Sequence, residues 1–158
     1  MTITPSLFEA YLKCRTKCFL RWLGETSTGN ECADFDRAQE SSYQTEGIKR
    51  WTQTLATNAC AAGDSVTLTG KRAKWRVAIG PVARAGDLES TIEAIEQVPA
   101  ESQGKQRQLI PIRFIRTNTL TRDDRMLVAF DAFVLAEMLG CATNVPRSSM
   151  GTRVRHSR

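Results

Sequence analysis

The segment from Leu109 to Gly140 constrains the fold most, because its apolar residues change from the spacing of a strand to that of a helix. The run Leu109–Ile115 is apolar apart from one central charge and predicts a buried strand. Thr121 can cap the next helix, with Asp124 as the acidic member of a capping box. The apolar residues expected on that helix recur at helical spacing before a terminating glycine, and they are Met126, Phe130, Phe133, Val134 and Met138.

Other segments predict a mixture of helices and strands. A cap at Thr4 and a proline after it start a helix expected over Pro5–Leu23. A second helix is expected from Cys32 to about Ala62, with core positions at Ile48, Trp51 and Leu55. Strands are expected at Ser65–Thr69 and Ala73–Ile79, whereas Leu88–Val98 suits either a helix or a strand. The chain therefore belongs to the α/β class.

Composition sets broader bounds. The chain has 158 residues, of which 41% are hydrophobic and 25% charged, as expected for one globular domain. No apolar run approaches the roughly 20 residues that span a bilayer, and the N-terminus lacks the features of a signal peptide. A cytoplasmic protein without a membrane partner is the simplest interpretation.

The net charge of +5 is unevenly distributed. Residues 99–158 contain ten Lys or Arg and five Asp or Glu, so the rest of the chain is neutral. A basic half is compatible with contacts to DNA phosphates, and equally with a solvated surface. The residues that we expect to contact nucleic acid are Arg107, Arg116, Arg122 and Arg125.

Two segments together resemble a known enzyme family. The first helix carries Cys14 and Leu20 and resembles the N-terminal cysteine signature of RecB-like and Cas4-like nucleases of the PD-(D/E)XK superfamily. The segment from Pro111 to Gly140 resembles their Glu-x-Lys strand and following helix. The resemblance implies a truncated restriction-endonuclease-like core, with a small central mixed sheet flanked by helices. Residues 1–140 would form this partial domain and 141–158 a basic, disordered tail, and Leu88–Val98 would be a strand.

The chain departs from the family pattern at the catalytic positions. Arg113 stands where the family has the metal-binding Glu, and Ile115 where it has the catalytic Lys. A guanidinium cannot coordinate Mg²⁺, and isoleucine cannot polarise water. The resemblance also implies a metal-binding acid on the preceding strand, for which Glu93 is the first candidate and Glu96 the second. A carboxylate of the long helix, such as Glu46 or Glu40, is a further metal candidate.

Replacement of the Glu-x-Lys pair suggests a role for Arg113. On adjacent strands, Arg113 and Glu93 would face each other, and the guanidinium would neutralise the acid in place of a cation. The alternative is that Arg113 extends to solvent from a half-exposed strand.

The five cysteines predict reduced thiols, since their number is odd and no secretion signal is present. In the resembling family the cysteine at the position of Cys14 joins three C-terminal cysteines around an iron–sulfur cluster. Such clusters need four ligands, and the C-terminal trio is not found here. We therefore expect no cofactor in this chain and a buried thiol at Cys14.

Three functions remain open from the sequence. The first is a truncated, catalytically inactive RecB/Cas4-like domain that binds DNA, or a partner protein that covers the truncated face. The second is an active Mg²⁺-dependent nuclease whose ligands have migrated to Glu93, Glu96 and Glu46. The third is a non-functional fragment or an interaction module unrelated to nucleic acid.

Overall fold

The computed structural model describes residues 1–25, 30–55, 60–62, 75–98, 108–117, 119–140 and 153–156. Its helices are α1 (Pro5–Lys13), α2 (Arg15–Trp22), α3 (Glu31–Gln53) and α4 (Arg122–Met138). Its strands are β1 (Cys60–Ala62), β2 (Val77–Ile79), β3 (Val82–Ala85), β4 (Leu88–Thr91), β5 (Ala94–Val98), β6 (Gln108–Ile115) and β7 (Arg153–His156). The α/β class expected from the sequence is confirmed.

The described strands form a mixed sheet and a separate hairpin. The sheet has the order β1-β2-β5-β6-β7, and the hairpin pairs β3 with β4. The β2-β5 and β5-β6 pairs are antiparallel, whereas β1-β2 and β6-β7 are parallel. Strand β7 lies in the segment expected to be a disordered tail, and it extends the sheet beside β6.

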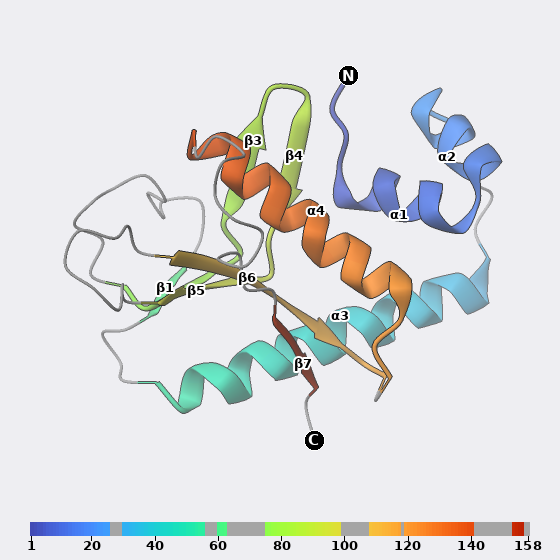
Figure 1. Ribbon diagram of the computed structural model, residues 1–158. Coiled ribbons are helices and arrows are strands. Elements are labelled where there is room, and N and C mark those ends of the chain that lie inside the picture. The colour runs from blue at the N-terminus through green and yellow to red at the C-terminus, as the bar shows by residue number, and fades with distance from the viewer. Residues whose placement is uncertain are drawn as a thin grey trace.

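Helices cover both faces of the sheet (Figure 1). Helix α4 lies on one face with α1 and the β3-β4 hairpin, and α3 crosses the other face. The α4 side holds one core cluster, formed by Ala78, Ala83, Ile92, Ile95, Phe130, Val134 and Leu135. The α3 side holds a second cluster, formed by Trp51, Val77, Ala94, Ile112 and Phe114. Because β6 is covered on both faces, its side chains are apolar at nearly every position.

The strand and helix that dominate the sequence pattern are confirmed. The run Leu109–Ile115 lies within β6, and the helix after it is α4 with its capping box of Thr121 and Asp124. Helix α4 is rotated from the phase that we predicted, however. Met126 and Phe133 are 39% and 48% exposed. The buried positions are instead Leu127, Val128, Phe130, Asp131, Ala132, Val134 and Leu135.

Two further expectations need correction. The helix expected over Pro5–Leu23 is interrupted at Cys14, whose backbone is extended and which ends α1 and begins α2. The long helix ends at Gln53 rather than near Ala62. For Leu88–Val98, which suits either a helix or a strand, the strand that the resemblance implies is confirmed, although a bend at Ile92–Glu93 divides it into β4 and β5. The strand expected at Ser65–Thr69 lies outside the described residues.

Helix α1 is docked onto α4 through aromatic packing. The rings of Phe8 and Phe130 stack with their centroids 5.0 Å apart, and Leu7 and Ala10 are buried. The N-terminal residues also bond to the hairpin, since Ile3 N–H donates to the Asp87 carbonyl at 2.7 Å. These contacts bring the C-terminal end of α1 close to the start of α4. In the described part of the chain, no helix is long and apolar enough to cross a bilayer.

Candidate functional site

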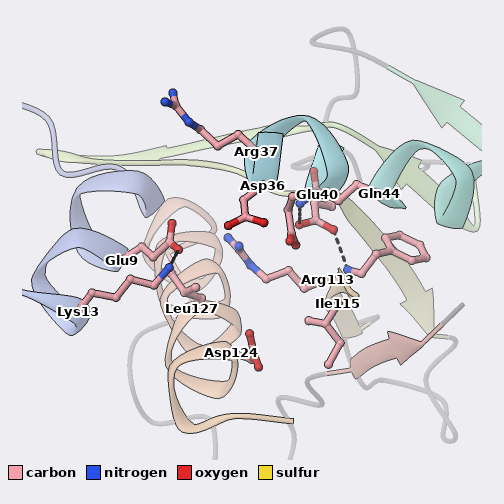
Figure 2. Close-up of a pocket in the computed structure, with 12 residues that line it drawn as sticks. Glu9, Lys13, Asp36, Arg37, Glu40, Gln44, Arg113, Ile115, Asp124 and Leu127 are labelled. Atoms are coloured by element: carbon pink, nitrogen blue, oxygen red, sulfur yellow. Dashed lines mark hydrogen bonds and ion pairs between the residues drawn. The ribbon is translucent and has the colours of Figure 1, made fainter. Parts of the chain in front are cut away.

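A cavity opens where the C-terminal half of β6 meets α1, α3 and α4. Its volume is about 340 Å³. Figure 2 shows the carboxylates of Asp36 and Glu40 on α3 directed toward Arg113 on β6, with Glu9 and Lys13 contributed by α1. The lining residues are Glu9, Lys13, Asp36, Arg37, Glu40, Gln44, Glu93, Arg113, Phe114, Ile115, Asp124 and Leu127.

Arg113 reaches the α4 side of the sheet because side chains alternate along β6. Ile112 and Phe114 pack into the α3-side cluster, so the residue between them faces the opposite helix. There the Arg113 Nε donates to Asp131 Oδ2 at 3.0 Å, and Nη2 donates to Oδ1 at 3.4 Å. The two side chains are 17% and 1% exposed, so this is a buried ion pair with two hydrogen bonds.

Asp131 also accepts a hydrogen bond from strand β4. The Ser90 hydroxyl on β4 donates to Asp131 Oδ1 at 2.6 Å, and Ser90 is fully buried. Burial disfavours the charged form of Arg113, but the charge of Asp131 and its hydrogen bonds outweigh this effect and raise the pKa of Arg113. The network Ser90–Asp131–Arg113 therefore joins β4, α4 and β6 through a satisfied buried charge pair.

Glu93 lies beside this pair but bonds to other groups. Its Oε2 accepts the Phe114 backbone N–H at 2.7 Å, and its Oε1 accepts the Gln44 side-chain amide at 3.0 Å. Burial raises the pKa of Glu93 to about 7, against the hydrogen bond from Phe114 and the charge of Arg113, which lower it. The nearby charges of Asp131 and Glu40 add to the upward shift. Near neutral pH, Glu93 is therefore divided between its protonated and ionised forms.

The expected pairing of Arg113 with Glu93 is replaced by pairing with Asp131. Arg113 lies close enough to lower the Glu93 pKa, but in the described ion pairs its partner is Asp131. The alternative, an Arg113 extended to solvent, is also wrong, because its side chain is only 17% exposed. Sequence reasoning missed Asp131. The sequence did contain a signal for its burial. Asp131 lies four residues from both Leu127 and Leu135, so it shares one helix face with these two apolar residues.

Only some of the expected metal-site residues lie together. Glu93, Arg113 and Ile115 line the cavity, whereas Glu96 and Glu46 do not. Glu96 is nearly buried on β5 and lies 3.8 Å from Arg76. Glu46 faces solvent on α3 and pairs with Arg50 at 2.8 Å, which lowers its pKa.

The donors around Arg113 do not fit a divalent cation. Mg²⁺ needs a shell of oxygen donors that are free to coordinate it. Both oxygens of Asp131 accept hydrogen bonds from Arg113, and both oxygens of Glu93 accept bonds from protein groups. Across the described residues, no group of three or more His, Cys, Asp or Glu is arranged to hold a metal ion.

The remaining predicted residues lie at the surface or outside the description. Arg116, Arg122 and Arg125 are exposed after β6 and in the first turn of α4, and Arg116 lies 3.8 Å from Asp36. Arg107 falls outside the described residues.

The expected burial of Cys14 is wrong, because this residue is exposed at the junction of α1 and α2. A hydrogen bond from the Lys17 backbone lowers its pKa.

Among known proteins, neither a family model nor a curated sequence matches this chain.

Proposed function

We propose that this chain is a nuclease-like domain that does not cleave nucleic acid and that binds DNA through phosphate contacts. The restriction-endonuclease-like architecture is part of this proposal. It is supported by the position of Glu93, which immediately precedes β5, next to Arg113 on β6, since Ala94 and Ile112 form the terminal β5-β6 residue pair. The observation that carries the proposal is the buried Arg113–Asp131 ion pair, which we take to replace the metal centre that the resembling nucleases have.

Loss of cleavage follows from the chemistry of this pair. Hydrolysis of a phosphodiester by a metal nuclease needs a cation that activates water and stabilises the leaving oxygen. To admit one, Asp131 must release Arg113 and Glu93 must ionise beside it. Breaking a buried ion pair costs about 3–5 kcal/mol. The arginine therefore supplies the positive charge, but no coordination site.

DNA contact is assigned to the exposed arginines rather than to the cavity. The cavity lining has five carboxylic acids and three basic side chains, so it does not attract phosphate. Arg116, Arg122 and Arg125 are exposed, and Arg116 lies 3.8 Å from Asp36, which lines the cavity. Guanidinium groups bind phosphate oxygens without reading the base sequence.

The test combines binding and cleavage on the same duplex. Three phosphate contacts predict a slope of about −3 in a plot of log K against log salt, or about 40-fold weaker binding when salt rises fourfold. Replacing Arg122 and Arg125 together by Gln should reduce this slope by about 2. Fluorescence anisotropy measures the slope, and gel analysis with Mg²⁺ or Mn²⁺ should detect no cleavage.

A matched control uses two other exposed arginines, Arg50 at the C-terminal end of α3 and Arg84 on the hairpin. Their replacement by Gln leaves the expected slope unchanged, although it removes the same charge. Absence of binding at low salt, or an equal loss in the control, contradicts the DNA interface. Metal-dependent cleavage by the purified protein contradicts the loss of activity and favours the nuclease with migrated ligands.

A further inference from the structure

Helix α2 differs from the other described helices in having no buried residue. Its main packing partner is α1, and Figure 1 shows it standing away from the sheet. Arg21 joins it to α1 by donating to the Ser6 carbonyl and hydroxyl, each at 3.3 Å. An amphipathic helix gains most of its stability by packing its apolar face, and α2 leaves that face uncovered.

The uncovered face is large and contiguous along the helix. Phe19 and Leu23 are each 60% exposed, and Leu20 and Trp22 are each 46% exposed. Phe19 lies three and four residues from Trp22 and Leu23, and Leu20 lies three residues from Leu23, so these four side chains are neighbours on the helix surface. Single exposed apolar residues are common, but a cluster of large ones marks an interaction site.

The charge on this helix has one sign. Arg15, Lys17 and Arg21 lie on α2, and no acid occurs between Ala10 and Gly24. We call α2 with Leu23 the basic patch. A surface of complementary charge is therefore the partner that it fits best.

This chain carries such a complementary surface itself. The first half of α3, Glu31–Glu40, contains four acids, which are Glu31, Asp34, Asp36 and Glu40, and one base. Phe35 stands among them and is 63% exposed. We call this half-helix the acidic patch. Glu31 and Asp34 are its exposed acids away from the cavity, whereas Asp36 and Glu40 line the cavity. Six residues separate Leu23 from Asn30, so these two residues lie within about 25 Å of each other.

We propose that the basic patch of one copy docks on the acidic patch of a second copy. Figure 1 shows α2 and the start of α3 at the same end of the molecule. This arrangement allows the contact to occur twice about a twofold axis, which gives a closed dimer. An anionic membrane would attract the basic patch but repel the acidic one close to it, so a second copy is the better partner. This dimer goes beyond the proposed function and does not depend on DNA binding.

Sedimentation equilibrium of the full chain tests the proposal. A dimer should form at about 50 mM salt and weaken at about 500 mM, because the charges are exposed and screened. Phe19→Ser should raise the dissociation constant at least about tenfold. Phe133→Ser is the matched control, since Phe133 is 48% exposed on α4 and lies in neither patch, and it should leave the constant unchanged.

Charge reversal tests whether the two patches meet. Arg15→Glu with Lys17→Glu makes both patches of a copy acidic, and Glu31→Lys with Asp34→Lys makes both patches basic. Each variant alone should be monomeric. Mixed together they should form a heterodimer, because each contact then joins opposite charges. Native mass spectrometry with one variant labelled with ¹⁵N identifies this species, and its formation also shows that both variants are folded.

Any of three results overturns the proposal. The first is a wild type that remains monomeric up to about 0.5 mM at low salt. The second is an equal change in the dissociation constant for Phe19→Ser and Phe133→Ser, and the third is a mixture of the charge-reversal variants that stays monomeric. Flotation with vesicles of phosphatidylcholine and phosphatidylserine distinguishes the membrane alternative. A monomer that floats with these vesicles assigns the basic patch to a lipid surface instead.

Discussion

Replacing Glu93 by Gln should make the protein more stable at alkaline pH than the wild type. The folded-state pKa of Glu93 is about 7, compared with an ordinary value of 4.5. Between these values the folded state binds more protons than the unfolded state, so stability falls as pH rises. Each pKa unit corresponds to 1.36 kcal/mol, so the shift amounts to about 3 kcal/mol. This contribution is fully present below pH 4.5 and lost above pH 7.

Glutamine keeps the contacts of Glu93 without its charge. The amide oxygen can accept the Phe114 N–H, and Gln44 can rotate its own amide to accept from the new NH₂ group. The unfolding free energy of Glu93→Gln minus that of the wild type should therefore increase by about 3 kcal/mol from pH 4 to pH 8. Urea denaturation followed by circular dichroism measures both proteins at each pH.

Glu46→Gln is the matched control, because the Arg50 hydrogen bond lowers the pKa of Glu46. A lowered pKa contributes stability that is present above the unfolded value and lost as pH falls through the folded value. The unfolding free energy of Glu46→Gln minus that of the wild type should therefore decrease as pH rises, whereas the same difference for Glu93→Gln increases. A flat difference for Glu93→Gln would refute the reasoning, since it would mean that Glu93 stays ionised in the fold. A ¹³C titration of the carboxyl carbon, with a midpoint below pH 5, would show this directly.

Two further substitutions test the packing around the site by urea denaturation. Asp131→Ala should lower the unfolding free energy by about 3–5 kcal/mol, because it leaves Arg113 charged and buried; a loss below about 1 kcal/mol would mean that water reaches Arg113. Gly47→Ala should also destabilise the fold, because the new Cβ would lie 2.6 Å from Cδ1 of the buried Phe114 ring. Overpacking costs about 1–3 kcal/mol, which exceeds the gain of about 1 kcal/mol in helix propensity; a more stable variant would contradict this clash.

Local patterns predict the elements where sequence and packing agree. Strand β6 and the capped start of α4 follow from short-range features, which are an apolar run and the Thr121–Asp124 capping box. The phase of α4 does not follow from these features. Phe130 belongs to both the expected and the observed face, but Met126 and Phe133 face outward. Their places in the core are taken by Leu127 and Leu135, on either side of Asp131.

The phase error has a physical cause. Asp131 is charged, so an analysis of hydrophobic spacing assigns it to solvent and rotates the helix accordingly. Its burial becomes favourable only because Arg113 and Ser90 meet it from strands 18 and 41 residues away. No pattern within α4 contains these partners. A buried charge on a helix is therefore predicted only together with its partner.

The identity of the arginine's partner depends on which face of the sheet each side chain reaches. Arg113 faces α4, where Asp131 meets it. Glu93 lies just before the first residue of β5, Ala94, which pairs with Ile112. Its carboxyl group accepts hydrogen bonds from the Phe114 N–H and from Gln44 on α3. The site thus combines one closed ion pair with one carboxyl that titrates near neutral pH. Two ionised carboxylates close together repel each other and need a cation between them. In this site the Arg113 guanidinium neutralises Asp131, and Glu93 is neutralised in part by its own protonation near neutral pH.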